Sequence, residues 1–443
     1  MKISVIGGAG YVGLITALGA SSMGHEVIST DIDKNKINNL QNNISPIYED
    51  NLDSLLKYCN LKNNIRFTTD SKIAIKQSDL IIISVGTPTN SKGEIDLSQV
   101  EKVTFDLLEN ISSYKLIVIK STLPITAVNM MKNTLSNKFK IDKDFDIISN
   151  PEFLREGRAV NDFYNPDRIV IGGETEKSIN ILKEFYDPLL KKELNIPKDI
   201  FISQNEIPIV ETNLPSAQMI KYGSNAFLAN KISFINEIAQ ICETVDANVN
   251  DVIEGMGIDP RIGNNYMQPG PGFGGPCLEK DLLALVELGN HYNLEATFMK
   301  AILERNERQV ELILNKIISE VKGEDLIVSI LGLSFKANTN DIRNSASIKL
   351  IDLLLDKGYK IKSYDPKAIY NLENENYNQF NDLYSSLESS SCVVIMTEWE
   401  EFEGLDLNKT SELMKTNIIL DMRNLLNLDK KNINKFKYYG LGN

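Results

Sequence analysis

Residues 1–13 read MKISVIGGAGYVG, and this stretch decides the fold class of the first part of the chain. The apolar run Ile3–Ile6 predicts a buried strand, and the pattern after the glycines predicts a helix over Gly13–Met23. Gly8, Gly10 and Gly13 therefore form a G-x-G-x-x-G motif, which allows a tight turn, close approach of a pyrophosphate and close helix–strand packing. The adjacent Gly7 leaves the register of the first glycine open. The motif predicts a dinucleotide site at the helix N-terminus.

An acidic residue at the end of the second predicted strand specifies the cofactor. Asp31 follows Glu26–Thr30 and lies 23 positions after Gly8. A carboxylate there accepts hydrogen bonds from the ribose hydroxyls and repels the 2′-phosphate of NADP, so NAD is favoured. The alternative is that the glycines form only a tight turn between a strand and a helix.

Apolar runs alternate with helical patterns in both halves of the chain, which indicates parallel sheets. Further candidate strands are Leu80–Val85, Leu116–Ile119, Asp146–Ser149, Arg168–Ile171, Leu326–Leu331, Lys360–Tyr364, Cys392–Met396 and Ile418–Leu420. Long helices are predicted over Ser216–Val245 and Lys280–Glu320, a domain edge over Lys191–Pro215, and a surface loop over Asn371–Asp382. The predicted fold class is α/β, with two Rossmann-like doubly wound units joined by a long central helix and a helical region.

The composition excludes several classes of protein. A chain of 443 residues is long enough for about three structural units. Its 60 Asp and Glu exceed its 47 Lys and Arg, and a net charge of -13 argues against nucleic-acid and anionic-membrane partners. No signal peptide is expected, no apolar run approaches the roughly 18–20 residues of a membrane span, and no cysteine pair has metal-ligand spacing. We therefore expect a cytoplasmic protein with reduced cysteines and no metal.

One glycine- and proline-rich loop carries a candidate nucleophile. The loop PGPGFGGPC (269–277) predicts several positive φ angles and ends at Cys277, where a helix begins. The helix N-terminus and the nearby Lys280 would both favour the thiolate. The other cysteines, Cys59, Cys242 and Cys392, are interpreted as small buried hydrophobes, which is the ordinary alternative for Cys277 as well. A thiolate beside NAD indicates oxidation of an aldehyde through a thiohemiacetal and a thioester.

At this point the chain resembles the UDP-glucose/GDP-mannose dehydrogenase family. The resemblance is carried by motifs in family order along nearly the whole chain, namely GAGYVG (8–13), VGTP (85–88), KST (120–122), NPEFLREG (150–157), KYGSN (221–225), FINE (234–237), RIG (261–263), GFGGPCLEKD (272–281), GLSFK (332–336), DIRNS (341–345), YDP (364–366) and TEW (397–399). It implies that NAD oxidises the C6 alcohol of a UDP-sugar to a carboxylate in two steps. Oxidation of UDP-glucose to UDP-glucuronate, for polysaccharide synthesis, is the leading expectation.

The resemblance also assigns roles to residues. It implies Cys277 as nucleophile, Lys221 and Asn225 as the pair that holds the oxyanion, and Thr122, Glu152 and Asp281 as groups that position water and transfer protons. The implied cofactor contacts are Gly8, Gly10, Tyr11, Val12, Gly13, Asp31, Lys36, Thr87, Thr122, Glu156, Lys280 and Arg343. The implied substrate contacts are Glu152, Phe153, Leu154, Arg155, Glu156, Lys221, Asn225, Arg261, Tyr266, Met267, Gln268, Pro269, Gly270, Gly274 and Lys336.

The pattern and the resemblance together divide the chain into three domains. They are an NAD-binding Rossmann domain (1–212), a central helical dimerisation domain with the cysteine loop (213–322) and a UDP-sugar-binding Rossmann-like domain (323–443). A homodimer is expected, in which Arg261 reaches the substrate of the other subunit. We expect Phe227, Ile232, Ile235, Ile238, Ala239 and Ile241 to cover more of the central helix than one intrachain stripe requires.

Some alternatives stay open. Lys221 with Asn225, Glu152 with Glu156, and Lys336 and Arg343 could each be ordinary exposed polar residues. Pro276 and Glu279 depart from the family's usual residues and leave the sugar specificity open, as does Gln218 ahead of Lys221. GDP-mannose or a UDP-N-acetylhexosamine is therefore the alternative substrate, and a non-catalytic NAD-binding regulator is the alternative function.

Overall fold

The computed structural model describes residues 1–88, 95–323, 326–426 and 435–442. The chain divides into two compact units, Met1–Gly223 and Ser224–Asn443. The second unit contains most of the predicted helical domain and all of the predicted C-terminal domain. The division into three domains stays a prediction.

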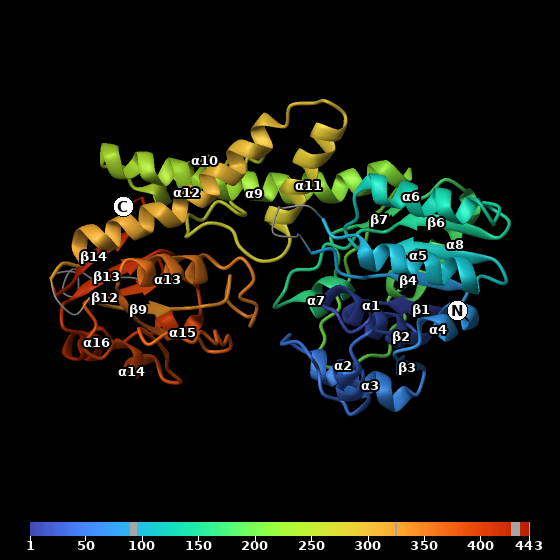
Figure 1. Cartoon of the computed structure of the whole chain (residues 1–443), viewed down its shortest axis with the longest axis horizontal. Helices are drawn as coiled ribbons and strands as arrows, with labels where there is room; N and C mark the ends of the chain where they lie inside the picture. The colour runs from blue at the N-terminus through green and yellow to red at the C-terminus, as the bar shows by residue number, and fades with distance from the viewer. Residues whose placement is uncertain (89–94, 324–325, 427–434, 443) are drawn as a thin grey trace. The chain divides into compact units, whose positions relative to one another are not determined.

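The first unit is built on a sheet that has the strand order β3-β2-β1-β4-β5-β6-β7-β8 within the described residues (Figure 1). The strands are β1 Lys2–Ile6, β2 Glu26–Thr30, β3 Ile65–Thr68, β4 Leu80–Ile83, β5 Lys115–Ile119, β6 Phe145–Ser149, β7 Ile169–Gly172 and β8 Ile209–Thr212. Neighbouring strands run parallel except at β6 and β7, which pair antiparallel at Ser149 and Gly172. The order from β3 to β6 is that of a doubly wound nucleotide-binding sheet, as the glycine motif predicts.

Helices cover both faces of this sheet because the side chains of each strand alternate between two cores. In β5, for example, Leu116 and Val118 point into one core while Ile117 and Ile119 point into the other. The helices are α1 Tyr11–Ser22, α2 Lys34–Gln41, α3 Leu52–Lys62, α4 Ser71–Gln77, α5 Ser98–Asn110, α6 Ile125–Ser136, α7 Ala159–Tyr164 and α8 Glu176–Leu190. Burial on both faces explains why these strands read as continuous apolar runs.

The second unit contains a helical group and a second sheet. The helices of the group are α9 Leu214–Val245, whose first turns belong to the first unit, α10 Val249–Gly257, α11 Leu278–His291 and α12 Thr297–Glu320. Ala229 of α9, Leu282 of α11 and Ile302 of α12 share one apolar cluster. α9 matches the predicted long helix closely. The predicted single helix over Lys280–Glu320 is wrong, because Asn293 takes a left-handed conformation with φ 55° and separates α11 from α12.

The second sheet repeats the topology of the first. Its described strands are all parallel and follow the order β11-β10-β9-β12-β13-β14. They are β9 Ile327–Leu331, β10 Lys360–Tyr364, β11 Tyr377–Gln379, β12 Cys392–Ile395, β13 Ile418–Asp421 and β14 Lys437–Gly440, accompanied by α13 Ala346–Asp356, α14 Leu383–Leu387, α15 Glu400–Glu403 and α16 Leu407–Leu413. The predicted loop over Asn371–Asp382 therefore contains a strand, β11, which forms because Tyr377 is buried in the core and hydrogen-bonds Ser363.

The two sheets also carry an acidic residue at the same position. Ile6 pairs with Thr30 and Leu331 pairs with Tyr364, so Asp31 and Asp365 each follow the last residue of an equivalent strand pair. Asp365 accepts hydrogen bonds from the amides of Leu333 and Ser334 in the loop after β9. It also accepts from the Ser334 hydroxyl and from the amides of residues 367 and 368.

Candidate active site

The glycine motif forms the connection between β1 and α1. The positive φ that the tight turn needs, 82°, is taken by Gly7 and not by Gly8, the first glycine of the predicted motif. A Cβ on Gly13 would lie 2.1 Å from the Gly7 carbonyl oxygen, so only glycine lets α1 approach the strand this closely. A Cβ on Gly10, the N-cap of α1, would meet nothing nearer than 3.5 Å, and no side chain caps the helix. The first amides of α1 thus present donors for a pyrophosphate, and the turn fits a dinucleotide.

The predicted ribose-binding acid lies against this turn. Asp31 accepts hydrogen bonds from the amides of Ala9 and Asp33, both at 3.1 Å. A carboxylate has about four acceptor sites, so capacity remains for ribose hydroxyls. Lys36 lies in the first turn of α2. Thr87 and Thr122 also come together, because the Thr87 hydroxyl donates to the Thr122 carbonyl at 3.3 Å.

A buried ion pair forms the centre of the first unit's candidate site. Lys221 of α9 donates to Glu152 at 2.9 Å, and both side chains are more than nine-tenths buried. Burial works to raise the pKa of the Glu152 carboxyl, but Lys221, the Leu154 amide and the charge of Lys120 outweigh it and lower the pKa overall. The interpretation of these two residues as exposed polar groups is therefore wrong.

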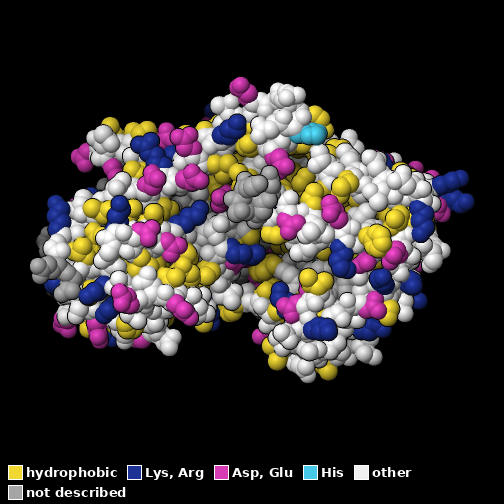
Figure 2. Space-filling model, viewed as in Figure 1, with side chains coloured by type: hydrophobic (Ala, Val, Ile, Leu, Met, Phe, Trp, Pro, Cys, Tyr) yellow, Lys and Arg dark blue, Asp and Glu magenta, His cyan; other side chains and the backbone are white. Residues whose placement is uncertain are grey.

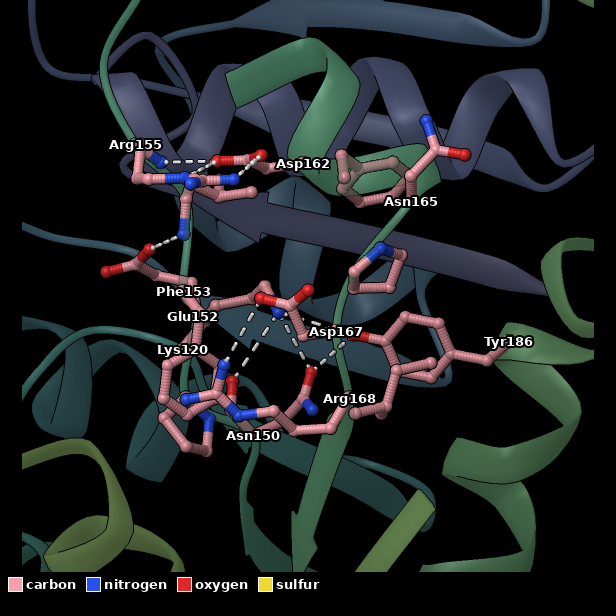
Figure 3. Close-up of a pocket in the computed structure, with 15 residues that line it drawn as sticks. Lys120, Asn150, Glu152, Phe153, Arg155, Asp162, Asn165, Asp167, Arg168 and Tyr186 are labelled. Carbon is pink, nitrogen blue, oxygen red and sulfur yellow. Dashed lines mark hydrogen bonds and ion pairs between the residues drawn. The ribbon is translucent and has the colours of Figure 1, made fainter. Parts of the chain in front are cut away.

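Figure 3 shows the segment after β6, which includes Glu152, Phe153 and Arg155. The Phe153 ring lies 3.5 Å from the Arg168 guanidinium and 5.3 Å from the Lys221 ammonium. Arg155 turns to Asp162 and forms hydrogen bonds of 2.7 and 2.8 Å with its carboxylate. The segment thus has well-defined partners within the first unit.

Glu49 holds the other end of this segment and was not identified from the sequence. Its buried carboxylate accepts hydrogen bonds from the Gly157 and Ala159 amides at 2.8 and 2.6 Å, and the Tyr11 hydroxyl accepts from Gly157 at 2.9 Å. Tyr11 therefore links the glycine motif to the segment that contains Glu156. A glutamate in a polar loop carries no sequence signal of burial.

The nucleophile predicted from the sequence lies in the second unit. Cys277 is exposed and is the N-cap of α11, as predicted. One turn later the buried Asp281 accepts a hydrogen bond from Asn225 of α9 at 2.6 Å, and the Lys280 ammonium lies 3.8 Å from Asp281. Asn225 is therefore held by an ionisable partner and is no exposed surface residue.

Buried amide side chains fix the loop that precedes Cys277. Gly272 and Gly275 take the predicted positive φ angles, 103° and 79°. Asn306 of α12 accepts from the Phe273 amide and donates to its carbonyl, at 2.8 and 3.0 Å. Asn236 and Gln309 bind the amide and carbonyl of Gly270 in the same way, both at 2.8 Å. These amides hold the loop in shape independently of any ligand.

The remaining predicted residues of the second unit lie on both sides of the loop. Gly274 packs against Asn344, and Gly275 donates to the Arg343 carbonyl at 3.0 Å. Arg343 pairs with Asp341, and Lys336 follows Phe335, whose ring contacts Gly275. Of the other predicted substrate contacts, Met267, Pro269 and Gly270 are buried, whereas Tyr266 and Gln268 are exposed. Arg261 is also exposed, and its guanidinium pairs with Asp259 at 2.6 Å.

The other cysteines are buried, as predicted. Cys59, Cys242 and Cys392 are buried, and burial raises the pKa of the Cys59 thiol to about 11. Among the described residues, no group of His, Cys, Asp and Glu could hold a metal ion. No described helix is long and apolar enough to cross a membrane. On the visible surface, acidic and basic side chains are intermixed (Figure 2).

Comparisons with known proteins agree on one family. The NAD-binding, central and UDP-binding domains of the UDP-glucose/GDP-mannose dehydrogenase family match residues 1–190, 215–308 and 329–428. The UDP-glucose 6-dehydrogenase TuaD of Bacillus subtilis is 38% identical over 100% of this chain and 93% of its own. The solved UDP-glucose dehydrogenase of Pyrobaculum islandicum has a TM-score of 0.87 at 31% identity and covers 99% of this chain, which covers 97% of it. The UDP-D-ManNAc dehydrogenase of Pyrococcus horikoshii has a TM-score of 0.86 at 27% identity, with coverage of 100% and 99%.

Proposed function

Because the chain belongs to the UDP-glucose/GDP-mannose dehydrogenase family, we propose that it oxidises UDP-glucose to UDP-glucuronate with two NAD. The observation that carries the chemistry is an exposed thiol, Cys277, at the N-terminus of α11, one turn before the hydrogen-bonded pair of Asp281 and Asn225. The choice of glucose is supported by the 38% identity to a UDP-glucose 6-dehydrogenase along the whole chain.

The overall reaction fixes what the site must do. One alcohol, two NAD and one water give one carboxylate, two NADH and three protons. Bound NAD supplies the acceptor for the two hydrides. The chain must therefore take up protons from a hydroxyl and a water, hold an oxyanion twice, and keep the aldehyde from leaving between the two oxidations.

Cys277 is the group that retains the aldehyde. Its thiolate adds to the aldehyde carbon and forms a C–S bond, and loss of hydride from that carbon leaves a thioester. Water then adds to the thioester, the C–S bond breaks, and the thiolate is regenerated as the acid leaves. An N-cap position favours the thiolate at both the first and the last of these steps.

Lys221 and Asn225 are four residues apart on α9 and supply donors for the oxyanion. Their own partners, Glu152 and Asp281, hold these two side chains in place. Glu152 and Asp281 are also the carboxylates available to accept protons, with Thr122 as a water ligand. This assignment gives each of these side chains a role in the reaction.

The stoichiometry of NADH tests the proposal. We expect two NADH for each UDP-glucose consumed, with UDP-glucuronate as product by mass spectrometry. The second candidate is a UDP-N-acetylhexosamine dehydrogenase, favoured by the solved UDP-D-ManNAc dehydrogenase with a TM-score of 0.86. A panel of UDP-glucose, UDP-N-acetylmannosamine and GDP-mannose separates the two. NAD binding without NADH from any sugar would make the chain a non-catalytic regulator.

A homodimer is the proposed assembly, and the exposed face of α9 supports it. Phe227, Phe234, Ile241 and Val245 are 42–64% exposed and lie at spacings of seven, seven and four along the helix, on one face. Of the residues expected to cover a dimer contact, Ile235 and Ala239 are instead buried against α10, so the expected stripe is corrected to this face. A second copy would cover it by two-fold symmetry, and Arg261, whose side chain is 87% exposed, is proposed to reach the substrate of that copy.

The free cysteines fit a reducing compartment, so we place the enzyme in the cytoplasm.

A further inference from the structure

Three polar side chains form a closed ring of hydrogen bonds inside the first unit (Figure 3). The Lys120 ammonium donates to the Asn150 side-chain oxygen at 3.0 Å and to the Tyr186 hydroxyl at 3.2 Å. The Tyr186 hydroxyl donates to the same Asn150 oxygen at 2.6 Å. All three side chains are buried, and the Asn150 amide nitrogen donates in turn to the Val170 carbonyl of β7 at 2.8 Å.

The ring lies at the carboxyl ends of β5 and β6. Lys120 directly follows β5 and lies two residues before Thr122, and Asn150 directly follows β6 and lies two residues before Glu152. The backbone amide of Asn150 also donates to the Ile119 carbonyl, at 2.9 Å. The ring therefore ties together the two strand ends from which both proton-handling groups of the first unit extend.

Lys120 brings a positive charge to the cavity that Glu152 also lines. Its hydrogen-bond acceptors are neutral, and among the described residues no carboxylate oxygen lies within 4.0 Å of its ammonium. Lys120 and Glu152 line the same small cavity of about 50 Å³, which has room for a few waters at most. The charges of Lys221 from α9 and Lys120 from the end of β5 lower the pKa of Glu152. The other charged side chains that line the cavity are Arg155, Asp162, Asp167 and Arg168, and the Arg168 guanidinium lies against the Phe153 ring.

We propose that Lys120 is a positioning residue for the reaction, which it serves by fixing the Asn150–Glu152 segment and by placing a positive charge at the cavity that Glu152 lines. This inference rests on the proposed function for its kinetic part only. A purely structural lysine would stabilise the fold without affecting Glu152.

The other end of β5 supplies a matched control. Lys115, the first residue of β5, is 1% exposed and donates to the carbonyls of Lys76 and Ser78, so it is a second buried ammonium with carbonyl partners. Lys115→Met and Lys120→Met each remove one such ammonium. The two variants therefore differ in their distance from Glu152 and not in the kind of group lost.

The first measurement needs no substrate. The Glu152 carboxyl is titrated by difference infrared spectroscopy, with Glu152→Gln subtracted from each protein. We expect Lys120→Met to raise the pKa of Glu152 and Lys115→Met to leave it unchanged. Equal titration curves in both variants would overturn the proposal, whatever the substrate of the enzyme. Should Lys120→Met not fold, Lys120→Gln decides, because it removes the charge and keeps a hydrogen-bond donor, and an unchanged Glu152 titration there would overturn the proposal equally.

The second measurement is the single-turnover rate of NADH formation. Loss of a correctly placed proton-transfer group lowers rates by about 10²–10⁴-fold. We expect Lys120→Met to lower the rate by about 10²-fold, with NAD affinity within about threefold of wild type, and Lys115→Met to lower it by less than about threefold. An equal loss of rate in the two variants would show that Lys120 has a structural role only and would overturn the proposal. Absence of turnover by the wild type would count against the proposed function and would leave the infrared result standing.

Discussion

Replacing Lys221 by Met isolates the energetic role of the buried ion pair. The substitution keeps the volume of the side-chain stem and leaves the Glu152 carboxylate, 8% exposed, without the ammonium 2.9 Å away. Breaking a buried pair by removing one partner costs about 3–5 kcal/mol. For a unit the size of Met1–Gly223, 1 kcal/mol corresponds to about 2–4 °C, so its unfolding midpoint at pH 8 falls by about 6–20 °C.

The sign of the pH dependence follows from Glu152. Because its pKa is lowered in the folded wild type, its ionised form stabilises the fold above the ordinary carboxyl pKa, and this contribution is lost as the pH falls through the folded value. In Lys221→Met, burial acts with less opposition and raises the pKa of Glu152 relative to wild type, so the carboxyl takes up a proton more readily. The difference between variant and wild type therefore narrows as the pH is lowered from 8 to 5.

Scanning calorimetry from pH 5 to pH 8 measures this difference. Lys132→Met is the matched control, because Lys132 pairs with Glu174 at 2.6 Å in the same unit but the pair is exposed. An exposed pair contributes at most about 1 kcal/mol, so the control shifts the midpoint by less than about 4 °C. A Lys221→Met shift no larger than that of the control, or one that is constant with pH, would refute the reasoning.

Three further predictions concern the reaction, the cofactor and the assembly. Cys277→Ser keeps NAD and UDP-glucose binding, measured by calorimetry, but forms no UDP-glucuronate, because an oxygen ester is a poorer acyl donor than a thioester; near-normal acid formation would exclude the covalent route. Asp31→Asn lowers the preference of kcat/KM for NAD over NADP, since the carboxylate no longer repels the 2′-phosphate, and a wild type that prefers NADP would contradict the role of Asp31. Phe234→Glu charges the exposed face of α9 and converts the dimer to monomers by light scattering, whereas Phe201→Glu, on a more exposed phenylalanine outside α9, does not; an active wild-type monomer would disprove the dimer.

The fold was largely predictable because its signals are local. Continuous apolar runs such as Ile81–Ile83 identify strands buried on both faces, and the glycines after Ile6 identify the turn into α1. The strands missed from the sequence are short or lie at the edges of the sheets, as β3, β8, β11 and β14 do. Such strands need fewer apolar residues, and their pairing depends on partners far away in the chain.

The residues of the candidate site also divide into those with a local sequence signal and those without one. Cys277 and Asp31 follow from motifs, since loop shape and strand ends are written in neighbouring residues. Lys120 and Tyr186 lie 66 residues apart, and Asn306 contacts Phe273 across 33 residues. An isolated lysine, tyrosine or asparagine in an amphipathic segment has the composition of a surface residue, so only the folded chain shows that it is buried and paired.

The duplicated acid of the two sheets has a thermodynamic consequence. Asp365 accepts hydrogen bonds from the amides of Leu333 and Ser334 in its own sheet and lies 3.4 Å from the Trp399 indole nitrogen. Among the described residues, Asp31 accepts hydrogen bonds from two amides. In the C-terminal sheet, the chain's own amides thus occupy the acceptor sites of Asp365, whereas in Asp31 acceptor sites remain for a ligand. NAD should accordingly stabilise the unit Met1–Gly223, which contains the glycine motif and Asp31: at 100 times its dissociation constant it adds about 2.7 kcal/mol to the free energy of unfolding of that unit.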